Sequence, residues 1–261
     1  MIAVKSFLGK LFGRKPEPPS ERPRMSVEAH EKACADTQEA MDRHWAKVGD
    51  VEEDVIAYVI PPIFQGGPAW PTLRQAYRVI RRPGSIVIAT DGMSDPYEDD
   101  GEENGFGMEL FVETRDIPAD FTGADGDVSA LKNSWAFELL ENCAAFVAEH
   151  GGVRDHVDQL GSISTEIPGV AGAHAVGSQV PDRFVLDDSI GLLIGGPPPD
   201  FPDIVEDTPF RPVRLIPLVV LTAAELQHVR TGDSQVRRAL AERLSALPQG
   251  HFSDLRRPSV I

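Results

Sequence analysis

The 261-residue chain has few cysteines and no long apolar run. Its only two cysteines, Cys34 and Cys143, form no CxxC or Cys/His spacing, which argues against a zinc site or a redox pair. Both lie on apolar stripes of expected helices, so we predict two small core residues in a reducing compartment. No segment reaches the length of a membrane-spanning helix, and lysines interrupt the apolar residues at the N-terminus, unlike a secretory signal. These absences predict a cytoplasmic protein without an integral membrane segment.

Basic residues are scarce relative to acidic ones. The chain has 25 Lys and Arg against 41 Asp and Glu, which gives a net charge of −16, and its pI is about 4.8. A field of this sign repels phosphate backbones and argues against nucleic acid as a partner. It favours a basic protein partner, although an acidic surface also serves solubility alone.

Motifs that would indicate catalysis or a bound cofactor are missing as well. Gly66 and Gly67 lack the spacing of a dinucleotide-binding loop. Ser94 does not lie in a GxSxG turn. Placing Gly101 at the sixth position of a calcium loop puts Pro96 where an aspartate is required. Without a complete catalytic constellation, the sequence predicts a protein that is not an enzyme and holds no cofactor or metal.

The first 24 residues are basic and proline-rich, unlike the remainder. Phe7–Arg14 could form a short helix with its apolar residues on one face, which is compatible with contact to a membrane surface. Such a short isolated helix is marginal in water, so a tail followed by a linker is the simpler interpretation. We therefore expect a basic tail and linker over residues 1–24 and a single domain over residues 25–261.

Apolar periodicity and capping residues predict helices and strands that interleave without regular βαβ spacing. This pattern indicates an α+β fold with a mixed, mainly antiparallel sheet flanked by helices. Pro217 lies in the middle of one expected strand, which predicts a sheet edge or a bulge. The expected elements include a helix from a Ser26 N-cap to Val48, a strand Val55–Ile60, a helix Val128–His150 capped by Asp127, a strand Arg211–Leu221, and a helix opened by a Thr222–Glu225 capping box.

Two expected strands, Ile86–Ala89 and Met108–Val112, enclose the most informative stretch of the chain. The connection between them is acidic, and binding residues often lie on such loops. We expect its entry and exit to be fixed because glycine tolerates a positive φ that strains other residues. The glycines with this structural role are Gly92, Gly105 and Gly107.

The same stretch resembles the central signature of the suppressor of fused family. Ile88–Tyr97 reads IATDGMSDPY and Gly105–Leu110 reads GFGMEL, similar to the family's Gly-Leu-Ser-Asp turn and its following Gly-Phe-Gly-x-Glu-Leu strand. Met93 replaces the more usual leucine, which conserves volume. Trp135 and the segment 215–226 fit the family's later helix and strand, so the resemblance covers roughly residues 50–247.

This resemblance implies a protein-binding domain. Animal members of the family bind and restrain Gli-type transcription factors, and bacterial members are thought to include immunity proteins that neutralise secreted toxins. The chain is similar to the bacterial branch, because it carries one family domain without the additional C-terminal domain of the animal proteins. Capture of an extended segment by strand addition at the proline-containing sheet edge would suit such a protein.

The expected function is therefore an inhibitor or immunity-type protein whose partner is a protein, such as a basic secreted toxin. An alternative is a metal-dependent hydrolase that uses the acidic loop Asp91–Glu103. The residues expected to bind the partner are Asp91, Ser94, Asp95, Tyr97, Glu98, Asp99, Asp100, Glu102 and Glu103.

Overall fold

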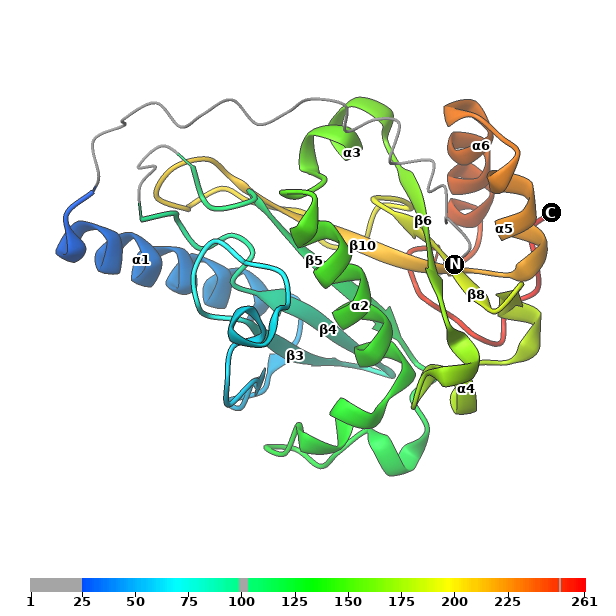
Figure 1. Cartoon of the computed structure of the whole chain (residues 1–261), viewed down its shortest axis with the longest axis horizontal. Coiled ribbons are helices and arrows are strands. Elements are labelled where there is room, and N and C mark those ends of the chain that lie inside the picture. Colours follow the sequence, from blue (N-terminus) through cyan, green and yellow to red (C-terminus); the bar gives the residue numbers. More distant parts are fainter. Residues whose placement is uncertain (1–24, 99–102, 249) are drawn as a thin grey trace.

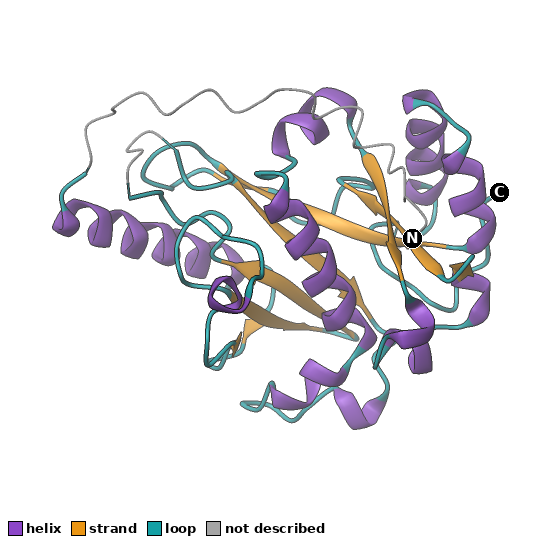
Figure 2. Cartoon of the chain, in the orientation of Figure 1, coloured by secondary structure: helices purple, strands orange, loops and turns teal. Residues whose placement is uncertain are grey.

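The computed structural model describes residues 25–98, 103–248 and 250–261. Its central sheet follows the order β1-β3-β4-β5-β10-β8-β6, with the short strands β2, β7 and β9 attached beside this path (Figures 1 and 2). The strands are β1 Asp50–Val51, β2 Ile56–Ala57, β3 Ala76–Arg82, β4 Ser85–Asp91, β5 Met108–Thr114, β6 Ile163–Pro168, β7 Val185–Leu186, β8 Ser189–Ile194, β9 Ile204–Val205 and β10 Val213–Leu221.

All strand pairs are antiparallel except β5 and β10, which run parallel. The expected α+β fold with a mixed, mainly antiparallel sheet is thus confirmed. The expected adjacent strands on either side of Met93 are also confirmed, because β4 pairs with β5. The α-helices are α1 Val27–Trp45, α2 Trp135–Glu149, α3 Arg154–Leu160, α4 Val176–Gln179, α5 Ala223–Arg230 and α6 Ser234–Ser245.

Helices cover both faces of the sheet, and the alternation of side chains along β10 shows how. Ile216, Leu218 and Val220 join the apolar cluster that contains α2. Val213 and Leu215 point to the other face and pack in the cluster of α1, whereas Val219 and Leu221 pack with α5 and α6. Figure 1 shows α2 lying across β4 and β5, with α5 and α6 together near β8. Burial on both faces explains the long apolar run of β10.

The expectation that Pro217 marks a sheet edge is wrong, because β10 lies between β5 and β8. β10 pairs with β5 through Arg214–Pro217 and with β8 through Leu218–Leu221. Pro217 therefore lies where the pairing passes from one neighbour to the other, and its carbonyl accepts from the Gly195 amide at 3.0 Å. A missing N–H is tolerated at such a position.

Two other expected elements are shorter than their apolar patterns indicate. Within Val55–Ile60 only Ile56 and Ala57 form a strand, and Val59 is fully exposed at 101%. The pairing with β3 stops at Ala57, four residues before Pro61. The first helix starts after its Ser26 cap as expected but ends at Trp45, and Val27 at its start is exposed.

The helix expected from Val128 begins later. Residues Ser129–Asn133 form a 3₁₀ turn, and α2 starts at Trp135 with Ser134 as its N-cap. The Asp127 carboxylate instead accepts from the amide and hydroxyl of Ser129, so it does not cap α2. The expected capping box at Thr222 and Glu225 is confirmed and opens α5.

Replacing Ser134 with alanine is expected to lower the free energy of unfolding by about 1 kcal/mol, because the buried hydroxyl accepts from the Phe137 amide. Urea-induced unfolding measures the change. Asp127→Ala is the matched control and should have a clearly smaller effect. An equal or larger loss for Asp127→Ala would contradict the assignment of Ser134 as the cap.

None of the helices in the described ranges is both long and apolar enough to cross a membrane. The possible surface helix Phe7–Arg14 lies outside these ranges.

Candidate functional site

The acidic loop begins where β4 ends, and its first two carboxylates bind an arginine from the segment before β3. Arg74 donates to both carboxylate oxygens of Asp95 at 2.9 and 3.0 Å and contacts Asp91 at 2.8 and 3.0 Å. Arg78, on β3, also donates to Asp91 at 3.1 Å. Burial alone would raise the pKa of Asp91, but the two arginines more than reverse this and hold that pKa below its ordinary value.

Glu109 on β5 organises the turn between these two acids. Its carboxylate is fully buried and accepts from the backbone amides of Gly92 and Ser94 at 3.1 and 2.8 Å. The hydroxyls of Ser94 and Thr90 donate to it at 2.6 and 2.5 Å. Burial and the nearby Asp91 raise the pKa of Glu109, and the bonds from Ser94 and Thr90 oppose that rise. The signature Glu of GFGMEL therefore holds the Gly-Met-Ser-Asp turn in place.

The exit of the loop is fixed by close backbone contacts at Gly105. This residue has a φ of 52°, and a Cβ there would lie 2.5 Å from the Asp95 carbonyl oxygen and 2.6 Å from that of Met93. Any larger residue would therefore push the exit away from the entry. Gly92 and Gly107 also have positive φ, at 136° and 66°. The Phe106 amide donates to the Met93 carbonyl at 2.8 Å and closes the turn.

The exit of the loop forms one side of a pocket of about 560 Å³. The other side is the junction between α2 and α3, where two histidines from the segment 150–156 line the cavity. Tyr97 and Phe106 pack edge to face with ring centroids 6.3 Å apart. The residues of this signature pocket are Tyr97, Glu103, Asn104, Gly105, Phe106, Gly107, His150, Gly151, Gly152, Arg154, Asp155, His156, Asp158 and Arg211.

Arginines fix the walls of the signature pocket. Arg154 donates to the carbonyls of Gly107 and Pro212 at 3.0 and 2.6 Å and so joins α3 to the loop exit. Arg211 forms an ion pair with Glu103 at 3.0 Å across the rim. The His150 ring donates from Nδ1 to the Phe146 carbonyl at 2.7 Å. The pocket is thus polar and built from three separate segments of the chain.

The structure divides the nine residues expected to bind a partner into three groups. Asp91, Ser94 and Asp95 are each 2% exposed, so they can act on a partner only through the loop that they hold. Tyr97 and Glu103 line the signature pocket, and Glu98, which follows Tyr97 in the chain, is exposed. The remaining residues, Asp99, Asp100 and Glu102, lie outside the described ranges.

Sequence reasoning missed the arginines and the α3 residues of the pocket. Arg74, Arg154 and Arg211 come from segments far from the loop, and no local spacing links them to it. The described residues also contain one group with metal-ligand side chains close together, and it lies outside the loop. Its members are Glu113, Asp200 and His251.

Comparison with protein families finds a match over most of the chain. The model of the suppressor of fused protein (SUFU) family matches residues 75–258, which is more than half of the chain. The chain belongs to the suppressor of fused family. The match begins later than the expected residue 50 and continues past 247 to the C-terminal segment. No curated protein matches the chain.

The suppressor of fused match covers β3 to β10, and therefore the paired carboxylates, the signature loop and the whole signature pocket. It leaves α1 outside. Membership in the suppressor of fused family makes this a domain of the protein-interaction type.

Proposed function

We propose that the chain is a non-catalytic inhibitor or immunity-type protein that neutralises a protein partner, such as a basic secreted toxin. The signature pocket forms the proposed binding site. The observation that carries this proposal is that the signature's buried carboxylates all serve the shape of the loop: Asp91 and Asp95 bind arginines, and Glu109 binds backbone amides.

This arrangement also weighs against the alternative hydrolase. A hydrolase that uses the loop acids needs carboxylates free to bind a cation or move a proton. Asp91 and Asp95 already share the guanidinium of Arg74, and a metal ion would have to displace it. Asp91 and Asp95 therefore make the contacts of residues that hold the loop in shape.

Charge supports a basic partner. The chain has a net charge of −16, the exposed Asp155 lines the signature pocket, and the exposed Glu98 follows Tyr97 in the chain. Opposite charge on the partner would accelerate association, and this acceleration falls as salt rises. Aromatic rings at the pocket, Tyr97 and Phe106, offer apolar contact area to the bound chain.

The proposal is tested by capturing partners from the native host with the immobilised chain and comparing two charge-reversed variants. Glu103→Lys/Asp155→Lys changes two acids that line the signature pocket, and Asp182→Lys/Glu242→Lys changes the same number of exposed acids elsewhere. The wild type and the control variant should retain a basic protein whose activity the added chain inhibits. The pocket variant should bind it at least about tenfold more weakly.

Failure of the wild type to retain any specific protein would overturn the proposed function. Equal binding by the pocket variant and the wild type would overturn the assigned site. A captured protein whose activity is unchanged by the chain would overturn the inhibitory role and leave only a binding role.

A further inference from the structure

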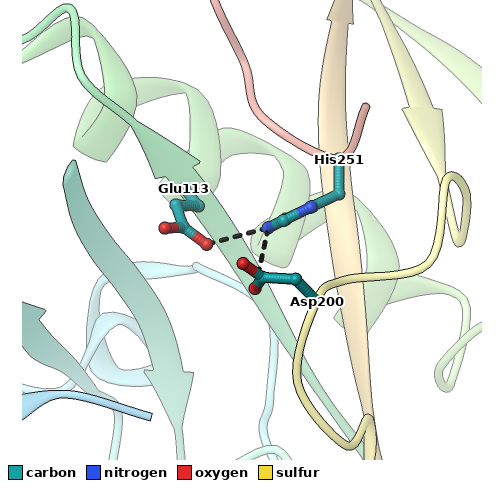
Figure 3. A group of neighbouring side chains, drawn as sticks. All are labelled: Glu113, Asp200 and His251. Carbon is teal, nitrogen blue, oxygen red and sulfur yellow. Dashed lines mark hydrogen bonds and ion pairs between the residues drawn. The ribbon is translucent and has the colours of Figure 1, made fainter. Parts of the chain in front are cut away.

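A group of three metal-ligand side chains lies at the end of β5, outside the signature pocket. Glu113 comes from β5, Asp200 from the loop after β8, and His251 from the C-terminal segment (Figure 3). One ligand atom from each lies within 4.8 Å of the others. His251 Nε2 is 2.9 Å from Glu113 Oε2 and 3.9 Å from Asp200 Oδ1. Three remote parts of the chain thus converge on one point.

These distances are close to those between ligands of one metal ion. Zinc binds histidine nitrogen and carboxylate oxygen at about 2.0–2.2 Å, which places neighbouring ligands of a tetrahedral site about 3.4 Å apart. Glu113 and His251 are 0% and 4% exposed, so their positions are fixed by packing. Asp200 is 59% exposed and can move to complete the site.

The group already binds a cation, the guanidinium of Arg82 on β3. Arg82 Nη1 lies 2.7 and 2.8 Å from the two oxygens of Glu113 and 3.0 Å from Asp200. An open pocket of about 420 Å³, lined by Arg82, Glu113 and Asp200, adjoins the group and gives it access to solvent. The Arg82 side chain can therefore turn outward, but Glu113 would then be buried without a cation, which is costly.

We propose that Glu113, Asp200 and His251 form a site for a divalent transition-metal ion, which binds in competition with the guanidinium of Arg82. Two carboxylates and a neutral imidazole carry a charge of −2, which such an ion neutralises. The imidazole favours zinc or cobalt over magnesium and calcium, which prefer oxygen ligands. The bound ion would fasten the C-terminal segment and the loop after β8 to the sheet.

Titration of the full-length protein with Co²⁺, followed by its visible absorption bands and by displacement with Zn²⁺, tests the site. The wild type is expected to bind one ion, and Mg²⁺ or Ca²⁺ in excess should not displace it. Arg82→Met removes the competing cation and should tighten binding by about tenfold or more. His251→Ala and Asp200→Asn each remove a ligand and should weaken binding by about tenfold or more.

Two features of the design keep the test decisive. Asp200 is an exposed residue, so Asp200→Asn reports on the site even if His251→Ala fails to fold. His174→Ala removes an exposed histidine outside the group and should bind as the wild type does. The proposal is overturned if neither the wild type nor Arg82→Met develops cobalt bands, or if the bands are unchanged in Asp200→Asn and His251→Ala.

Discussion

Replacing Arg74 with methionine is expected to lower the free energy of unfolding by about 3–5 kcal/mol. Arg74 provides all the cationic contacts that the described residues give Asp95 and two of the three that they give Asp91. Both carboxylates are nearly inaccessible to water. Methionine preserves the unbranched stem but leaves Asp95, among the described residues, with only the Thr72 hydroxyl as a side-chain donor. The loss arises from a buried charge without its counterion.

Arg43→Met is the control for this variant, because Arg43 forms an exposed pair with Glu39 one turn away on α1. Such surface pairs contribute less than about 1 kcal/mol. Urea-induced unfolding at neutral pH compares the two variants with the wild type. If Arg74→Met lowers the free energy of unfolding no more than Arg43→Met does, the signature loop does not depend on the buried ion pairs.

The pairing of Asp91 with Arg74 also gives the stability an expected pH dependence. The folded-state pKa of Asp91 lies below its ordinary value, so its contribution to stability is present above the unfolded-state pKa of about 4. That contribution is lost as the pH falls through the folded-state value. The advantage of the wild type over Arg74→Met should therefore be constant near neutral pH and shrink below about pH 4. A difference that grows on acidification would contradict this account.

Local patterns were sufficient to predict the strands around Met93 and the capping box of α5. Alternating apolar residues, turn glycines and the Thr222–Glu225 spacing act within a few residues of one another, so the sequence carries them directly. The place of β10 in the sheet could not be found in this way. By local rules Pro217 indicates a sheet edge. The sheet tolerates its missing N–H because the pairing of β10 passes there from β5 to β8, and both strands come from distant segments.

The candidate site shows the same limit. Asp and Glu are usually exposed, so the sequence predicts that Asp91 and Asp95 belong to a binding surface. Their burial depends on Arg74 and Arg78, whose pairing with the loop is set by the register of β3 against β4. The start of α2 shows the same limit. Asp127 suits a helix start by local rules, but the segment Ser129–Asn133 forms a 3₁₀ turn and Ser134 caps α2 instead.

The second large effect is expected at Glu109. Glu109→Ala should lower the free energy of unfolding by on the order of 4 kcal/mol, because the buried amides of Gly92 and Ser94 lose their common acceptor. The hydroxyls of Ser94 and Thr90 lose theirs as well. Since these donors set the direction in which the chain leaves β4, the signature pocket should also be disordered and partner binding lost.

Glu109→Gln separates the hydrogen bonds from the space that the side chain fills. The amide oxygen can still accept from a backbone amide, but the amide nitrogen faces donors where the carboxylate had accepted. Chemical denaturation should therefore show a clearly smaller loss of unfolding free energy for Glu109→Gln than for Glu109→Ala, and partner binding should be partly retained. If both variants unfold at the same denaturant concentration as the wild type and bind the partner equally well, Glu109 does not organise the turn. The proposed site would then have to be sought on another face of the sheet.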